Sequence, residues 1–340
     1  WDGTDRKNNF HPRFLATIKP LKGLSLALSY SYELVDEDIM RKPVLLEGWN
    51  FLTDQVTYTT KTKFNITNED NKIERYFNDA VLRYHHKFFK NSLTLDYMLG
   101  ASQELYRAKD LHVTKQDMID LDMSVLDGAT GQASANGGIS EWAMRSVFSR
   151  LNLNWQDRYL LEFNLRADGS SRFLKNKRWG YFPSLSAAWR MDQEKFMEGA
   201  FNGKLSNLKL RVSYGSLGNN NVGNYASQSL YTSNKGELNY VLGNTMVTGM
   251  AQIALANRQL SWESTKVFDV GLDFGWFNNR LTGTLDYFNK RTTDILIDLP
   301  APAVHGTTSL PKVNSATVTN HGLEFTLGWQ DQVNGFSYGA

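Results

Sequence analysis

The most regular feature of the sequence is an alternation of apolar and polar side chains along extended segments. Residues 159–167 carry aromatic or aliphatic side chains at the odd positions, with Glu162, Asn164 and Arg166 between them. Residues 179–191 repeat the pattern, with Trp, Tyr, Leu, Ala and Met opposed to Gly, Ser and Arg. A period of two is typical of a β-strand with one apolar face. The two segments therefore predict a pair of long amphipathic strands joined by a basic, glycine-bearing loop.

The same period predicts about twelve strands along the chain. They lie near residues 9–19, 24–32, 76–88, 92–103, 142–155, 159–167, 179–191, 208–214, 268–276, 281–287, 323–329 and 336–340.

The predicted connections alternate between short and long. The tight turns fall at residues 20–23, 88–91, 156–158, 277–280 and 330–335. The long polar stretches fall at residues 33–75, 104–141, 218–262 and 291–317. Residues 192–207 occupy a tight-turn position but are longer, with room for one short helix, and loop 168–178 is short for its long-loop position. In an antiparallel meander all tight turns then lie at one end, as in an outer-membrane barrel.

The aromatic residues of the apolar faces fall into two groups. Four tryptophans lie at the tight-turn end, and Trp179 and Tyr181 lie at the long-loop end. Because Trp and Tyr prefer the headgroup level of a bilayer, two such bands indicate a lipid-facing surface. The predicted membrane-interface aromatic residues are Trp155, Trp179, Tyr181, Trp189, Trp276 and Trp329.

Composition agrees with this interpretation and excludes several others. The 340 residues carry a net charge of +2 and no cysteine, which excludes disulfides and thiolate chemistry and does not favour nucleic acid. No apolar run reaches the roughly 18 residues of a spanning helix. The sequence predicts an all-β fold, a transmembrane antiparallel up-and-down β-barrel. A soluble β-sandwich or adhesin domain is the alternative, because alternation alone also fits an antiparallel sandwich.

Five segments resemble the SusC/RagA family of TonB-dependent outer-membrane transporters. They are DRYLLEFNLRADGSSRF, RWGYFPSLSAAWR, LKLRVSYGSLGNNNVGNY, FDVGLDFGWFNNRLTGTLDYFNKRTTDIL and VTNHGLEFTLGW, and they cover most of residues 145–330 in order. Before about residue 75, only the barrel pattern agrees.

The resemblance implies a function that composition does not show. Members have a 22-stranded barrel, an N-terminal plug domain and a TonB box, and they work with a SusD-like surface lipoprotein. The expected function is TonB-dependent import of oligomeric nutrients, glycans or peptides, across a Bacteroidetes-like outer membrane. Residues 1–340 would then be a portion of one barrel domain, most of its second half, without the plug or TonB box. The alternative of a different class is a structural barrel that anchors a surface protein complex without transport.

No pattern of an enzyme, metal site or cofactor site stands out. His85 and His86 are adjacent strand positions whose rings point to opposite faces. The residues expected to face the lumen are Asp96, Glu162, Arg166, Arg190, Lys209, Arg211, Asp269, Asp273, Asp286 and Glu324. Hydration of the lumen and contact with a plug are favoured for them over direct substrate contact.

The long loops hold aromatic residues that could stack on sugar rings or peptide side chains. These candidate substrate-binding residues are Trp49, Tyr58, Tyr106, Tyr225, Tyr231 and Tyr240. Loop packing or contact with a lid is the competing interpretation for each. The basic side chains of loop 168–178, Lys175 and Lys177 among them, are expected to face polar neighbours or lipopolysaccharide phosphates. The remaining expected partners are the SusD-like lipoprotein, TonB and lipid.

Overall fold

The computed structural model describes residues 2–44, 47–59, 64–199, 201, 204–232, 238–254, 256–298, 300, 310, 312–333 and 335–340. Almost all of its regular structure is β-strand. Among these residues no helix is both long and apolar enough to cross a membrane.

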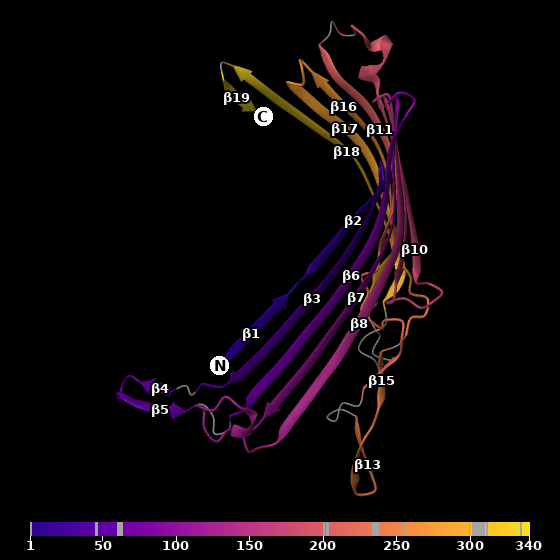
Figure 1. Ribbon diagram of the computed structural model, residues 1–340. Coiled ribbons are helices and arrows are strands. Elements are labelled where there is room, and N and C mark those ends of the chain that lie inside the picture. The colour runs from indigo at the N-terminus through magenta and orange to yellow at the C-terminus, as the bar shows by residue number, and fades with distance from the viewer. Residues whose placement is uncertain are drawn as a thin grey trace. The chain divides into compact units, whose positions relative to one another are not determined.

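One antiparallel sheet holds most of the strands, and its neighbours follow the chain order (Figure 1). Its strands are β1 (Asp2–Phe10), β2 (Arg13–Leu21), β3 (Leu24–Lys42), β6 (Ile66–Phe88), β7 (Leu93–Lys115), β8 (Ala133–Trp155), β9 (Tyr159–Ser170), β10 (Trp179–Arg190), β11 (Leu205–Asn219), β16 (Glu263–Trp276), β17 (Leu281–Ile297), β18 (Val313–Val333) and β19 (Phe336–Gly339). Both β1 and β2 pair with β3, so they act as two halves of one interrupted strand. The predicted all-β meander and its strand number are confirmed.

In the described part of the chain, small antiparallel strand pairs and short 3₁₀ turns lie in the connections. The strand pairs are β4 (Glu47–Asn50) with β5 (Gln55–Thr59), β12 (Leu230–Thr232) with β15 (Ala251–Ala254), and β13 (Asn239–Leu242) with β14 (Thr245–Thr248). The 3₁₀ turns are η1 (Leu126–Gly128), η2 (Met191–Gln193) and η3 (Lys195–Met197). Connector 192–207 therefore holds short 3₁₀ turns where one short helix was expected.

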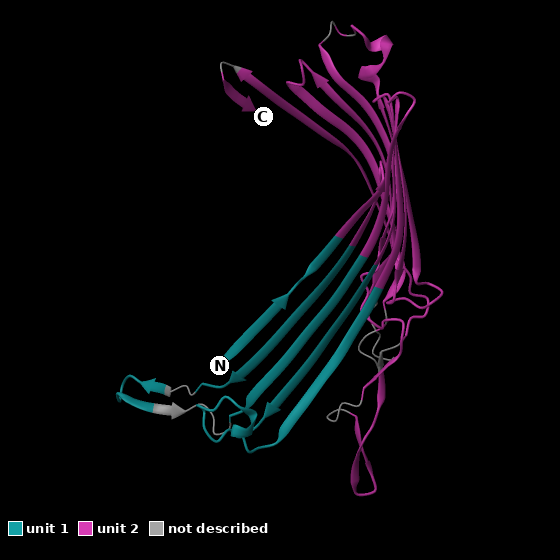
Figure 2. Cartoon of the chain, in the orientation of Figure 1, with its two compact units in different colours: residues 1–15, 29–78, 103–143 teal, residues 16–28, 79–102, 144–340 magenta. Residues whose placement is uncertain are grey.

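The chain divides into two compact units (Figure 2). Unit 1 comprises residues 1–15, 29–78 and 103–143, and unit 2 comprises residues 16–28, 79–102 and 144–340. Strands β3, β6, β7 and β8 each contribute residues to both units.

In unit 1 the strands are longer, and the connections shorter, than the sequence predicted. Residues 33–42, 66–75, 104–115 and 133–141, expected in loops, belong to β3, β6, β7 and β8. These parts of the strands carry many charged and polar residues, and their apolar residues, such as Leu34, Val35 and Ile39, do not alternate regularly, so the hydrophobic period is lost while the backbone pairing continues. Ion pairs across the strands stabilise the register instead, from Arg75 to Glu33 at 3.5 Å and to Glu104 at 3.2 Å.

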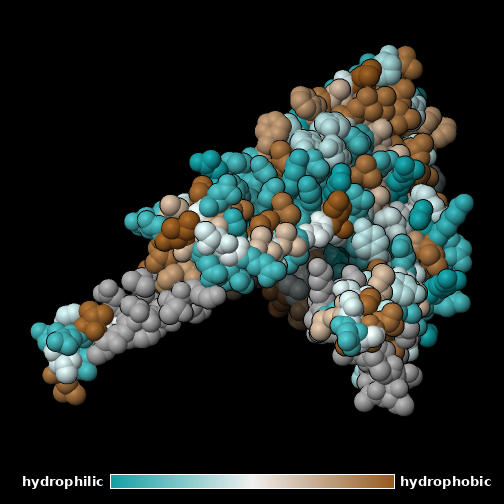
Figure 3. Space-filling model, turned by 90° about the horizontal axis from the view of Figure 1, so that it is seen from below, coloured by the Kyte–Doolittle hydropathy of each residue, from teal (hydrophilic) through white to brown (hydrophobic). Residues whose placement is uncertain are grey.

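Unit 2 holds the strands that carry the strongest alternation, and their register is regular. Trp189 pairs with Tyr159, Leu210 with Leu272, and Leu272 with Leu285, so side chains of one kind form rows across the strands. The apolar rows stand at the surface: Leu285 is 45% exposed and Phe325 63%. Figure 3 shows large hydrophobic groups at the molecular surface. A sheet with this much exposed apolar area requires an apolar environment on that side.

A buried hydrophobic cluster of unit 2 lies among loops. Phe173, Val222 and Leu260 are at most 4% exposed and pack together, with Trp262 and Leu296 against them. The cluster joins loop 171–178 to the segments that follow β11 and precede β16. The loops around it are therefore packed against one another.

Candidate functional site

The polar face of unit 2 carries a network of ion pairs on β11, β16 and β17. The Arg211 guanidinium donates from Nε to both carboxylate oxygens of Asp273, at 2.9 and 3.0 Å, and from Nη2 to Asp286 Oδ1 at 2.8 Å. Lys209 Nζ lies 2.9 Å from Asp273 Oδ2, and Asp269 lies 3.9 Å from Arg211 Nη1. Five residues predicted to face the lumen thus meet in one network.

A glycine makes this network possible. Gly271 pairs with Arg211 on one side and with Asp286 on the other, so it stands between the two charges. A Cβ at Gly271 would overlap the Asp286 carboxylate and lie 2.7 Å from Arg211 Nη2. The missing side chain leaves the gap through which the guanidinium reaches a carboxylate two strands away.

A second polar cluster surrounds Arg166 on β9. Its Nε donates to Asp168 Oδ2 at 2.8 Å and its Nη2 to Ser146 Oγ at 2.9 Å. The guanidinium also lies over the Phe148 ring, 5.4 Å from its centroid, a cation–π geometry. The Phe148 ring lies against Gly100, where any Cβ would overlap it. An aromatic surface is therefore held flat on a face that is otherwise polar.

The remaining predicted lumen residues have other neighbours. Asp96 Oδ1 lies 2.6 Å from His85 Nδ1, and Arg190 donates to Asp192 Oδ2 at 3.1 Å. Glu162 accepts from the Asn164 amide at 2.7 Å. The last member of the set, Glu324 on β18, lies opposite Asp286 of β17 in the strand register.

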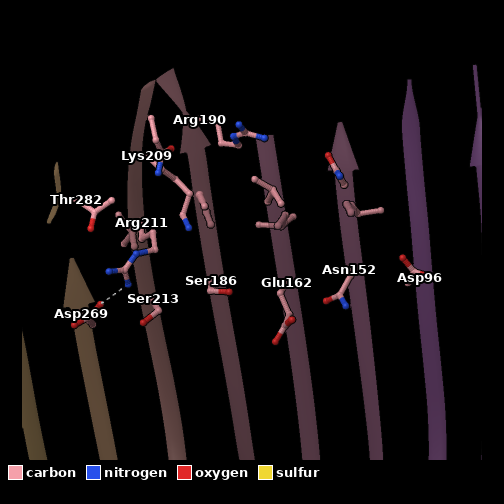
Figure 4. A pocket seen from close by; sticks show the side chains of 18 of the residues that line it. Asp96, Asn152, Glu162, Ser186, Arg190, Lys209, Arg211, Ser213, Asp269 and Thr282 are labelled. Atoms are coloured by element: carbon pink, nitrogen blue, oxygen red, sulfur yellow. Dashed lines mark ion pairs between the residues drawn. The ribbon is translucent and has the colours of Figure 1, made fainter. Parts of the chain in front are cut away.

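Two hollows line this face. Figure 4 shows the first, of about 980 Å³, where labelled side chains such as Glu162, Lys209 and Asp269 project from adjacent strands to the same side. The second, of about 760 Å³, is lined by the Arg166 cluster together with Phe182 and serine residues. Charged groups of both signs, amides and hydroxyls can hydrate a passage or form hydrogen bonds with a solute. The side chains that line the two hollows are therefore suited to bind a polar solute rather than to catalyse a reaction.

The predicted loop aromatics occupy different places. Trp49 is in β4 and 50% exposed, Tyr231 is in β12 and 62% exposed, and Tyr240 is in β13 and 51% exposed. Tyr225 is half-buried in a turn with φ of 64°. Tyr58 belongs to β5, and its side chain lies outside the described part of the chain.

Tyr106 was wrongly placed in a loop. It belongs to β7, stacks on Trp142 with ring centroids 5.5 Å apart, and has the Arg75 guanidinium 5.8 Å from its ring. The sequence missed this because β7 continues beyond its alternating segment. The role of the six aromatics in binding stays a prediction.

The predicted interface aromatics lie where the turn pattern puts them. Trp155 and Trp189 flank Tyr159, with ring centroids 5.9 and 6.5 Å from it. Trp276 and Trp329 lie on either side of the turn residue Phe277, each 6.5 Å from its ring. Trp155 and Trp276 end β8 and β16 directly before tight turns, whereas Trp189 lies next to the end of β10 before the longer connector, and Trp329 lies four residues before the end of β18. At the other end of β10 lie the two remaining predicted interface aromatics. Trp179 is 45% exposed and Tyr181 is 67% exposed.

The basic side chains of loop 168–178 fall into two groups, one in contact with other loops and one exposed. Arg172 donates to Asn224 Oδ1 at 3.0 Å and to the Asn220 carbonyl at 3.2 Å, so it joins the buried loop cluster. Lys175 and Lys177 are exposed, as a contact with lipopolysaccharide would require. The sequence did not identify Phe173 or Phe148 as structural centres, although a glycine facing a large aromatic ring, as Gly100 faces Phe148, could have indicated the second.

A lipid-exposed apolar face, a polar opposite face, aromatic rows at both ends and tight turns at one end define the wall of an outer-membrane β-barrel. Residues 2–340 match the family model of the TonB dependent receptor-like β-barrel, and the chain belongs to that family. Members are integral outer-membrane receptors and transporters rather than enzymes.

The most similar relatives support a narrower assignment. The chain is 38% identical over 183 residues to the TonB-dependent receptor SusC of Bacteroides thetaiotaomicron, which covers 54% of this chain and 18% of that protein. It is 26% identical to the TonB-dependent receptor P3 of Formosa agariphila over 97% of this chain and 31% of that protein. These matches confirm the predicted SusC/RagA resemblance.

The fold has a close counterpart among solved structures. The RagAB peptide transporter superposes with a TM-score of 0.84 at 24% identity, over 98% of this chain and 35% of that chain. The chain thus spans about a third or less of the length of the relatives it matches. The predicted barrel fold is confirmed.

Proposed function

We propose that the chain forms part of the wall of an energy-coupled importer that takes up an oligomeric nutrient, a glycan or a peptide. The observation that carries the proposal is the polar face of unit 2, with its two hollows and paired charges opposite an apolar lipid face. Such a face suits the passage of a hydrated solute rather than an apolar one. A SusC-named relative and a structural counterpart described as a peptide transporter point in the same direction.

The proposal includes partners of the intact protein. TonB would engage a region outside residues 1–340, and a SusD-like lipoprotein would cover the loop end. The exposed aromatics Tyr231 and Tyr240 in the loops of unit 2 support capture by these loops, because aromatic faces stack on sugars and peptide side chains at low entropic cost.

Uptake by cells carrying the intact transporter tests the proposal. Fluorescent oligosaccharide and oligopeptide pools are supplied to wild-type cells, to cells lacking TonB and to cells lacking the proposed SusD-like lipoprotein. We expect import of one pool that stops without TonB and falls without the lipoprotein, while monomer uptake is unchanged. Import of neither pool, with loss of surface proteins on deletion of the transporter, would instead support a structural anchor.

The loop aromatics are tested separately. The paired change Tyr231→Ala and Tyr240→Ala should weaken capture about 5–150-fold, because each ring contributes about 0.5–1.5 kcal/mol and the pair about 1–3 kcal/mol. Phe51→Ala is the control, because Phe51 is 91% exposed in the β4–β5 turn and was not predicted to bind. Equal uptake by both variants at equal surface abundance would remove these tyrosines from the binding surface.

A further inference from the structure

The connector between β10 and β11 is the exception among the tight turns. The turns at 156–158 and 277–280, which occupy the same position in the alternation of short and long connections, are short, whereas this connector contains η2 and η3 and continues to Leu205. Figure 1 shows its coiled turns at the upper end of β11. Two of its residues are large, apolar and exposed: Phe196 is 67% exposed and Phe201 58%.

Both phenylalanines pack on tryptophans of the apolar face. The Phe196 ring lies edge-on against Trp189, with centroids 6.2 Å apart, and the Phe201 ring lies edge-on against Trp276, with centroids 5.0 Å apart. Because the tryptophan rows lie on the lipid side of the wall, the connector continues the aromatic surface of that side.

Polar contacts hold the connector in this position. Glu194 accepts from the Tyr159 hydroxyl at 2.6 Å and from the Trp189 indole nitrogen at 3.2 Å, and it lies 3.6 Å from Arg158. Its side chain is only 13% exposed. The donors that Trp and Tyr commonly offer to lipid headgroups are here bound by the protein itself. The connector is therefore fastened to the aromatic row.

We infer that this connector is a membrane anchor, whose Phe196 and Phe201 insert among the phospholipids of the leaflet at the tight-turn end. Continuity with the lipid-facing tryptophans identifies lipid as the occupant. Phe is favourable at the boundary between headgroups and acyl chains, and the exposed Lys195 stands beside it for a phosphate group. The inserted rings and the pinned Glu194 would fix the depth of β10 and β11 in the bilayer.

The inference is tested in the full-length transporter reconstituted in phosphatidylethanolamine and phosphatidylglycerol vesicles. Single cysteines at Phe196 and Phe201 carry a bimane fluorophore, in a background freed of any cysteine outside residues 1–340, which contain none. Glu198→Cys is the matched control on the same connector, and Leu285→Cys is the control within the lipid-facing row. Quenching is measured with phospholipids brominated near the headgroup and with aqueous iodide.

We expect labels at Phe196 and Phe201 to be quenched by the brominated lipids several-fold more than the label at Glu198, and less by iodide. Iodide quenching equal to that at Glu198 would place the connector in water and overturn the inference. Protection from both quenchers would show a covering protein and overturn it as well. A photoactivatable phospholipid provides a readout on the unsubstituted protein, in which cross-links should map to residues 192–201; their absence there, with cross-links elsewhere on the wall, would also contradict insertion.

Discussion

The substitution Gly271→Ala tests whether the ion-pair network depends on an empty position between two strands. The added methyl would overlap the Asp286 carboxylate and crowd the Arg211 guanidinium at 2.7 Å from Nη2. The Arg211–Asp286 hydrogen bond of 2.8 Å would then open. Bonds to charged groups contribute about 1.5–3 kcal/mol, and the low end applies because the Arg211 side chain is 33% exposed.

Two smaller effects change this figure in opposite directions. Alanine restricts the unfolded chain, which favours folding by about 0.4–1 kcal/mol. Displacement of the guanidinium also loosens its contacts with Asp273, which adds a cost of about 1 kcal/mol. The expected net destabilisation is about 1–2 kcal/mol, or about 1–3 °C in the thermal midpoint of a long chain.

The assay is thermal unfolding of the intact transporter in detergent, followed by tryptophan fluorescence. Gly215→Ala is the control, because its Cβ would meet only Ser184 Cβ at 3.3 Å on the same face. In an Asp286→Ala background the cost of Gly271→Ala should fall, since the overlapping carboxylate is gone. An equal cost in both backgrounds, or no difference from Gly215→Ala, would refute the proposed role of the glycine.

The remaining predictions concern the lipid face, the connector and the loop cluster. Leu272→Arg puts a charge in the middle of an apolar row and should cost about 2–4 kcal/mol, measured as loss of folded barrel in the outer membrane; normal assembly would contradict it. Hydrogen bonding from Tyr159 is the largest cause that lowers the pKa of Glu194 below its ordinary 4.5. The stabilising contact is therefore complete above that value and is lost as pH falls through the lowered pKa, so an acid-induced fluorescence change in the wild type should be absent from Glu194→Gln. Phe173→Ala empties the loop cluster at a local cost of about 3–5 kcal/mol and should speed proteolysis within residues 220–262, whereas Phe51→Ala should not.

The sequence predicted the amphipathic strands of unit 2 well because each strand of a membrane barrel faces lipid on one side and water on the other. The period of two fixed the faces, and the placement of Arg211, Asp273 and Asp286 on a common side followed from it. Turn segments such as FFKN and FNNR were also located correctly, with positive φ at Phe89, Phe277 and neighbouring residues.

The same reasoning failed where a strand carries many charged and polar residues. In the unit 1 parts of β3, β6, β7 and β8 the apolar residues do not alternate regularly, so the sequence pattern could not separate these parts from loops, and Tyr106 was misplaced with them. The packing of Phe173 on Val222 and Leu260 joins loops that are distant in sequence. The gap at Gly271 depends on the register of three strands, which a single strand's pattern does not contain.

Position-by-position measurement along β16 tests the central claim that this chain is a lipid-facing wall with a polar inner face. Spin labels are attached to single cysteines at positions 269, 270, 272, 273 and 274 of the full-length protein in vesicles. Collision with oxygen dissolved in the hydrocarbon should be high at Val270, Leu272 and Phe274 and low at Asp269 and Asp273. Uniform accessibility, or the opposite phase, would contradict the account.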